Sequence, residues 1–541
     1  MSLNGAVLGR KFAGRAFFPL FSAILLFFCP ILTTFSQTEP AEAPKTPAAP
    51  VLASASDAGV AVTQPDAHYD PVQVNGVYFD GWETPQAALV ITGLLNGYIE
   101  PCGCAGMDRM KGGLSRRHTF FRQLFEQGWP VAAVDTGLIT NGFGVQEELK
   151  FDMAVNSFRL MNYDMIGISA NELRFPADVL LTYTVPSSLD DQSLFASANV
   201  GIYGFSDIYT LPFKTFVRGG IKFGATSVVF ADQTANRDEN IFVEPPEKKL
   251  REILPRILEK NCDHLILIVH GSEEQTMQMA AQFKEFDIVV TGDSPADPPA
   301  VSKMTPDGQF LIEVGEKGKF AVVLGFYEGE ETPRYQRVAL DSRYSRSDDV
   351  YRLMEGYQEI LKGIITTKGY RGLGLGVIDS PRRAALGDFV GSKKCESCHE
   401  ESYRTWRKNK HSSAWASLST VPPTTDSADP VRDFDPECIS CHVIGWQSRE
   451  NFPYAGGFLD MEKTPHLADV GCESCHGPGS KHIEAELGDD ETLQETVRGE
   501  MRLGEGAEKM CQTCHDEDNS PDFEFKSYYK IIEHFDTPPE N

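Results

Sequence analysis

Residues 470–476 read VGCESCH, and the same Cys-x-x-Cys-His pattern returns at 393–399 (KKCESCH), 436–442 (PECISCH) and 509–515 (KMCQTCH). At the cysteine and histidine content of this chain, chance would give about 0.006 such matches, so four copies are a strong signal. All four lie in the last third of a 541-residue chain. What the motifs bind therefore decides the fold of that region.

Disulfides, zinc and covalently attached haem are the three chemistries that this pattern could serve. Disulfides alone fit poorly, because eleven of the twelve cysteines, an odd number, remain once Cys29 leaves with a predicted export signal. Zinc ribbons need no histidine directly after the second cysteine, where it is badly placed for the same tetrahedral metal. Haem uses all three residues, since the two thiols form thioethers to its vinyl groups and the imidazole becomes an axial iron ligand. The pattern therefore predicts four covalently attached c-type haems.

Each predicted haem takes two cysteines and one histidine from its motif. The thioether residues are Cys395 and Cys398, Cys438 and Cys441, Cys472 and Cys475, and Cys511 and Cys514, and the proximal iron ligands are His399, His442, His476 and His515. This spacing leaves only about forty residues per haem, so the macrocycles must form much of the core and lie close together. Closely packed haems in one small domain indicate an electron conduit.

The first 36 residues have the form of an export signal. Basic residues precede the apolar run AFFPLFSAILLFFCPIL, and the small residues Thr34 and Ser36 suit a cut before Gln37. A cleaved signal is favoured over an uncleaved anchor, because the run is at the short end for spanning a bilayer. We expect an exported, periplasmic or otherwise extracytoplasmic protein, with no membrane span in the mature chain unless the signal stays attached. Residues 37–81, rich in Ala and Pro, are predicted to be a disordered linker.

The charge of the chain limits its partners. The formal net charge is −27 at pH 7. Nucleic acid and anionic membrane surfaces would repel such a chain, so neither is expected to bind it. An acidic surface also simply keeps an exported protein in solution, and that interpretation is favoured over the steering of basic partners. The expected partners are redox proteins, which could include other cytochromes.

Residues 82–341 are organised differently from the tail. Short apolar runs such as AALVITGLL, HLILIVHG and DIVVTGD alternate with amphipathic stretches such as ELKFDMAVNSFRLM, which predicts a layered α/β domain with one large core. The stretch KKLREILPRILEKN is predicted to be a helix that Pro255 kinks or breaks. Residues 342–386 are a polar connection with one predicted helix, DDVYRLMEGYQEILKG, and the mainly α, loop-rich haem domain occupies 387–541.

The order of the elements in 82–341 resembles the metallophosphoesterase fold, in particular its exported 5′-nucleotidase branch. LLNGYIEP and GGLSRR are similar to the first strand, loop and helix of that family, VDTG to its second strand, and LIVHG and IVVTGDSP to its later metal loops. The resemblance implies a dinuclear site of Asp, His and Asn side chains at strand ends. Of the corresponding positions only His270 keeps the family's residue, and the others are Leu94, Asn96, Leu138, Ala170, Asn171, Asp293 and Pro295.

Leucine and alanine offer a metal no donor atoms, so phosphoester hydrolysis by that mechanism is predicted to be absent. His270 is expected to be a hydrogen-bonded histidine at a strand end rather than a ligand. Beyond the first strand, EPCGCAG carries Cys102 and Cys104. Three roles stay open for this pair: a structural bond or packing role, with Cys262 as one partner; a redox-active dithiol; or soft-metal ligation. The structural role is favoured.

The tail resembles the tetrahaem cytochrome c-554 family over nearly all of 389–535. The similar stretches are VGSKKCESCHEESYRTWRKNKHSSAW, PECISCHVIGW, GCESCHGPGSKH and CQTCHDEDNSPDFEF. The resemblance implies electron transfer in the periplasm, a second haem left five-coordinate, and distal ligands at His411, His482 and His534, each on a predicted helix. His466, in the loop TPHLADV, is the remaining candidate, and a solvent-facing loop histidine is the favoured interpretation. The haem on His442 would then keep an open face.

Two functions follow from these patterns. In the favoured one, the tail relays electrons and the phosphoesterase-like domain is a non-catalytic docking or binding module. In the other, the chain is an enzyme: a haem oxidoreductase acting on a small nitrogen or sulfur compound at an open iron or, with less support, a phosphohydrolase with a rebuilt metal site. Distal histidines distinguish the electron carrier from the oxidoreductase, and metal ligands test the phosphohydrolase.

Overall fold

The computed structural model describes residues 69–102, 108–185, 193–230, 237–419 and 431–534. All of them belong to one compact unit, 67–541. The predicted signal and the first part of the predicted linker lie outside the described residues. The end of that linker is ordered, contrary to expectation: it contains α1 (Pro71–Asn75), and Tyr78 and Phe79 pack against the main core, because aromatic rings gain from leaving water.

The first sheet has the strand order β13-β12-β1-β2-β3. Parallel pairing joins β1 to β2 and β2 to β3, whereas β12 and β13 are antiparallel additions beside β1. The strands are β1 (Ala87–Thr92), β2 (Val131–Asp135), β3 (Met165–Ile166), β12 (Phe320–Phe326) and β13 (Arg334–Ala339).

The second sheet has the order β10-β11-β9-β8-β6-β5, with a parallel centre and antiparallel edges. Its strands are β5 (Lys214–Arg218), β6 (Ile221–Val229), β8 (His264–His270), β9 (Ile288–Thr291), β10 (Lys303–Met304) and β11 (Phe310–Ile312). Two short strands, β4 (Val200–Ile202) and β7 (Ile241–Val243), form a separate antiparallel pair.

The two sheets pack face to face between layers of helices. In β1, Leu89 and Ile91 enter the apolar cluster between the sheets, while Ala88 and Val90 enter the cluster under the helices. This alternation is the two-residue period of a strand buried on both faces. The predicted layered α/β domain is therefore confirmed.

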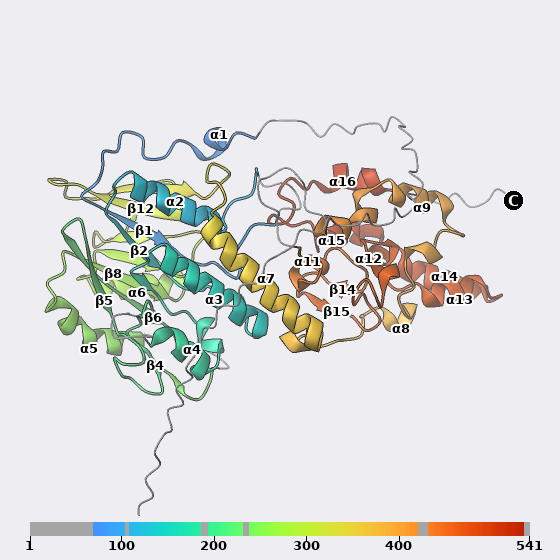
Figure 1. Cartoon of the computed structure of the whole chain (residues 1–541), viewed down its shortest axis with the longest axis horizontal. Coiled ribbons are helices and arrows are strands. Elements are labelled where there is room, and N and C mark those ends of the chain that lie inside the picture. The colour runs from blue at the N-terminus through green and yellow to red at the C-terminus, as the bar shows by residue number, and fades with distance from the viewer. Residues whose placement is uncertain (1–68, 103–107, 186–192, 231–236, 420–430, 535–541) are drawn as a thin grey trace, which may run out of the picture. The chain divides into compact units, whose positions relative to one another are not determined.

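Helices α2 (Leu114–Glu126), α3 (Val145–Leu160) and α7 (Asp348–Lys368) lie side by side over the first sheet (Figure 1). The helix predicted in the connecting segment is α7, and its buried residues Val350, Met354 and Leu361 recur at helical spacing within the main core. This helix therefore belongs to the α/β domain rather than to a polar connection.

Helices α5 (Pro246–Leu258) and α6 (Glu273–Gln282) cover the other face of the second sheet, and η1 (Glu172–Arg174) and α4 (Ala177–Thr184) follow β3. The predicted break at Pro255 is wrong, because α5 continues through this residue. Pro255 lies in the last turn, where its ring disturbs few backbone hydrogen bonds before the helix ends at Leu258.

The tail is built from short helices and loops. They are η3 (Tyr370–Leu373), α8 (Arg383–Leu386), η4 (Ser392–Lys394), α9 (Glu400–Arg407), η5 (Lys410–Ser413), α10 (Ala416–Ser419), α11 (Pro436–Ile439), η6 (Pro465–Leu467), α12 (Cys472–His476), α13 (Ser480–Glu486), α14 (Glu491–Met501), η7 (Gly504–Gly506), α15 (Ala507–Cys511) and α16 (Phe525–Ile532), with the strand pair β14 (Trp446–Gln447) and β15 (Phe452–Pro453). Its apolar clusters are small, one around Ile439 and Phe458 and one around Leu386. None of the helices in the described part of the chain is both long and apolar enough to span a membrane.

Two details of the tail differ from the prediction. The single helix expected around His411 is interrupted, because Asn409 caps a new turn by accepting a hydrogen bond from the His411 N–H at 3.0 Å. His534 lies just beyond α16 rather than on it. Only His482 lies on an α-helix as expected.

Candidate functional site

Local backbone turns bring the cysteines and the histidine of each motif together. In the first and fourth motifs, the histidine N–H donates to the carbonyl of the first cysteine at 2.9 Å, closing one helical turn. In the third motif, α12 spans Cys472–His476. Residues three and four apart in a helical turn share a face, so both thiols and the imidazole can meet one macrocycle.

Three of the motif histidines face a second imidazole across the tail, and each pair of ring centres is 6.0 Å apart. The pairs are His399 with His482, His515 with His411, and His476 with His534. An iron bonded to one nitrogen of each ring at about 2 Å would place the two ring centres about 6 Å apart. The three pairs therefore fit axial coordination of a haem iron.

Hydrogen bonds at Nδ1 leave the other ring nitrogen of several of these histidines able to bind iron. Nδ1 lies 2.7 Å from the Ala414 carbonyl oxygen in His442, 2.8 Å from that of Met501 in His476, and 2.7 Å from that of Ile532 in His534. A carbonyl only accepts, so Nδ1 carries the proton and Nε2 keeps its lone pair.

Burial keeps a fourth histidine in the form that binds metals. Burial, together with the nearby His515 and His442, lowers the pKa of His411 to about 4. The His411 ring is therefore neutral near pH 7, and a neutral imidazole is the form that coordinates iron.

The motifs are neighbours in two pairs. The side chains of Cys395 and Cys472 are neighbours, which brings the first motif beside the third. Those of Cys441 and Cys514 are also neighbours, which brings the second motif beside the fourth. Groups attached at these sulfurs would lie close together, as an electron conduit requires.

His466, the remaining distal candidate, lies in the turn η6 with an exposed side chain. Its ring lies beside Gly391, close to the start of the first motif. The other three distal candidates are all members of the imidazole pairs.

Three residues at strand ends of the α/β domain have left-handed backbone conformations. Leu94, Asn96 and Leu138 follow β1 and β2 with φ of 51°, 52° and 57°. Left-handed φ is uncommon for residues other than glycine and persists where the surrounding structure enforces it, often at functional edges. Among the described residues, however, no group of three or more His, Cys, Asp or Glu side chains could hold a metal ion.

Buried polar residues that sequence reasoning missed occupy this edge. Arg117 donates to Asp135 at 3.0 Å, with side chains 1% and 0% exposed, and the Thr92 hydroxyl donates to the same carboxylate at 2.6 Å. Burial raises the pKa of Asp135, and Arg117 opposes that rise. The only signal in the sequence was the position of Asp135 within VDTG.

Glu172 and His270 tie the loops of the same edge together. Glu172 accepts hydrogen bonds from the backbone N–H of Ile139 at 2.7 Å and of Ser169 at 2.8 Å. His270 Nε2 donates to the Thr136 carbonyl at 2.7 Å, and burial lowers the pKa of His270 to about 4. His270 is thus a buried, hydrogen-bonded strand-end histidine, as predicted.

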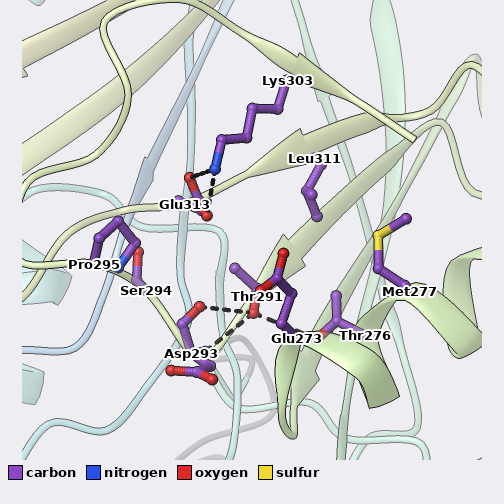
Figure 2. Close-up of a pocket in the computed structure, with 10 residues that line it drawn as sticks. All are labelled: Glu273, Thr276, Met277, Thr291, Asp293, Ser294, Pro295, Lys303, Leu311 and Glu313. Carbon is purple, nitrogen blue, oxygen red and sulfur yellow. Dashed lines mark hydrogen bonds and ion pairs between the residues drawn. The ribbon is translucent and has the colours of Figure 1, made fainter. Parts of the chain in front are cut away.

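A cavity of about 340 Å³ lies beside the end of β9 (Figure 2). Asp293 and Pro295, both at positions compared with metal loops, are among its lining residues. Figure 2 shows Lys303 directed at Glu313, 2.8 Å away, while Thr291 Oγ1 donates to the Asp293 carbonyl at 3.0 Å. The polar groups around the cavity thus bond to one another rather than converge on one point.

The cysteines outside the motifs are separate from one another. Cys102 lies near Cys438 and Cys441 of the second motif, whereas Cys262 packs in the cluster beneath α5. Among the described residues, no disulfide joins Cys102 to Cys262, so that one bond is not formed, whereas the other roles considered for the pair stay predictions. Cys104 lies outside the described residues.

Known proteins resemble the two parts of the chain separately. Residues 394–477 match the family model described as cytochrome c554 and c-prime. The tail is similar to cytochrome c554 over these residues. Cytochrome c-554 of Nitrosomonas europaea is 33% identical over 147 residues, which cover 24% of this chain and 59% of that protein. Multiheme cytochrome MtrA of Shewanella baltica is 26% identical over 117 residues, which cover 20% of this chain and 34% of that protein.

The structure is also similar to that of a 5′-nucleotidase precursor from Thermus thermophilus. The TM-score is 0.43 at 16% identity, over 52% of this chain and 59% of that one. The chain thus spans less than two thirds of each of these three relatives. Both predicted resemblances, to a cytochrome c-554 and to a 5′-nucleotidase, are found, and the cytochrome relatives imply covalently bound c-type haem.

Proposed function

We propose that this chain is an exported electron-transfer protein that carries four covalently attached haems. One observation carries the proposal: three imidazole pairs, each joining a motif histidine to a distal histidine at a separation that suits iron. The proposed proximal and distal ligands are His399 with His482, His515 with His411, and His476 with His534.

An iron held between two imidazoles has no position left for a substrate, so its chemistry is electron exchange. Haem, when bound, supplies a reversible one-electron iron couple. The paired imidazoles of the tail would hold the irons, and the neighbouring cysteines Cys395 and Cys472, and Cys441 and Cys514, would bring the attached groups close together. This arrangement supports relay of electrons between neighbouring haems to a redox partner protein.

A haem oxidoreductase is the second candidate, and it would act at the iron on His442. The three distal histidines from the imidazole pairs serve other irons, and His466, the fourth candidate, is exposed. A small nitrogen or sulfur compound could then reach this iron.

The haem count and carbon monoxide binding test both candidates. We expect a pyridine haemochrome assay to give four haems per chain, none extracted by acidified organic solvent. After reduction, one haem should bind carbon monoxide and three should not. Extractable haem or a count clearly below four would contradict the cytochrome proposal. Four haems indifferent to carbon monoxide would exclude the oxidoreductase and leave electron transfer standing.

The α/β domain is proposed to be non-catalytic. Leu94 and Leu138 offer no donor atoms, and Asp135 at the end of β2 is already paired with the buried Arg117. We expect the full chain with added zinc, manganese or cobalt to hydrolyse neither nucleotides nor simple phosphoesters. Metal-dependent turnover that disappears in His270→Ala would contradict this.

A further inference from the structure

The α/β domain contacts the segment that carries the second motif through a buried cation. Lys150, on α3, is 2% exposed. Its Nζ bonds the carboxylate of Glu437, the residue directly before Cys438, and lies 3.5 Å from Glu147. A buried ammonium needs such partners, because leaving water is costly for an unpaired charge. The glutamate beside the second haem attachment site is thus neutralised from a different domain.

Neighbouring side chains fix the start of the same segment. Asp435 caps α11 and is 3% exposed. Its two carboxylate oxygens accept hydrogen bonds from the side-chain amides of Gln146, on α3, at 3.1 Å and of Gln358, on α7, at 2.8 Å. Both helices of the α/β domain therefore hold the turn that presents the second motif.

Ion pairs extend this contact on either side. Glu100, in the loop after β1, pairs with Arg432 at 2.6 Å. Beyond the fourth motif, Asp518 pairs with Lys319 at 2.6 Å, and Asp522 pairs with Arg109 at 2.5 Å. The α/β domain thus reaches the second and fourth motifs, the two that also contact each other.

Glutamates in the first and third motifs have their partners within the tail itself. Glu396 pairs with Lys393, three residues away and largely exposed. Glu473 accepts backbone N–H groups of Gly391 and Gly479, each at 2.7 Å. Among the described residues, Glu437 is therefore the motif glutamate whose counter-charge comes from the α/β domain.

We propose that Lys150 is a positioning residue for the second haem, and that the α/β domain is the scaffold that sets the charge beside this haem. The inference rests on the proposed function, because it requires haem at Cys438 and Cys441. A buried positive charge opposes the gain of positive charge at a nearby iron and so raises its reduction potential. Lys150 offsets the opposite effect of Glu437.

Redox titration of the full chain, followed optically and by the paramagnetic signals of each haem, tests this proposal. We expect Lys150→Met to lower one of four midpoint potentials, Glu437→Gln to raise the same one, and the double variant to return near the wild-type value. Lys150→Arg keeps the charge and should leave all four unchanged. Lys248→Met removes a lysine from the exposed pair with Glu244 in the same domain and serves as the matched control.

The haem count tests the proposed function, and the midpoint potentials test the role of Lys150. A wild-type count below four haems would contradict the proposed function and is measured first. With four haems present, unchanged potentials in Lys150→Met and Glu437→Gln, or an equal shift of all four, would overturn the role of Lys150. If Lys150→Met fails to fold, Glu437→Gln decides: a rise in one potential supports the proposal, and no shift refutes it.

Discussion

Protonation of His270 should destabilise the α/β domain at mildly acidic pH. The ring is 3% exposed, its Nε2 donates to the Thr136 carbonyl, and burial lowers its pKa from 6.5 to about 4. In the unfolded chain the ring takes up a proton near pH 6.5, but in the folded chain only near pH 4. The stability linked to the neutral ring is therefore fully present above pH 6.5 and is lost as the pH falls toward 4.

The magnitude follows from the two pKa values of His270. A difference between 6.5 and about 4 corresponds to about 3 kcal/mol of unfolding free energy below both values, of which about 2 kcal/mol is lost between pH 7 and pH 5. Denaturant unfolding of the full chain, followed by far-ultraviolet circular dichroism, measures this loss. His270→Gln keeps an N–H donor for the Thr136 carbonyl but has no group that titrates in this range. Between pH 7 and pH 5, the variant should therefore lose about 2 kcal/mol less unfolding free energy than the wild type.

Equal pH dependence in wild type and His270→Gln would refute the assignment of a buried neutral ring. Metal addition provides a second check on the same residue. Zinc, manganese or cobalt that stabilised wild type but not His270→Gln would mean that His270 binds metal, because a ligand of the folded state raises its stability.

Three further changes test the haem pairs and the α/β domain. His482→Ala should open the iron on His399 and raise the number of haems that bind carbon monoxide by one, and an unchanged number would reject this pair. Arg117→Met leaves Asp135 buried without its cation, so it should reduce the unfolding free energy by about 3–5 kcal/mol in denaturant titrations; a loss under 1 kcal/mol would argue against the pair. Ser272→Ala removes the hydroxyl that accepts the Gln275 N–H at the start of α6 and should cost about 1 kcal/mol by the same measurement, with no effect on haem spectra.

Local patterns in the sequence predicted the elements of the fold better than its long-range contacts. The apolar runs gave β1, β8 and β9, because strands buried on both faces are continuously hydrophobic. Helix α14 was not singled out, although Leu493, Val497 and Met501 recur at helical spacing, because most of its other residues are charged or polar and only Val497 is buried. The cap at Asn409 was missed because it interrupts a stretch whose composition remains helical.

In the candidate site, too, local features were predictable from the sequence and long-range contacts were not. The motifs indicate which histidines are proximal, because the cysteines and the histidine lie within one turn. They do not indicate that His399 faces His482 rather than another ring, because that choice depends on packing of the whole tail. Glu437 and Lys150 lie 287 residues apart in the sequence, so no spacing connects them. An ordinary lysine on an amphipathic stretch gives no sign that it will be buried.

The strand-end edge of the α/β domain is connected to the contact with the second motif through the loop after β2 and helix α3. Glu172 holds the backbone of Leu138 and Ile139 at the strand end where a metal ligand would otherwise be needed. This loop leads into α3, which begins at Val145 and carries Lys150. The hydrogen bonds of Glu172 therefore fix the loop that leads into α3. If the helices of the α/β domain hold a haem-binding segment, as proposed, this role needs no hydrolysis, and the potentials of Lys150→Met test it more directly than any hydrolysis assay.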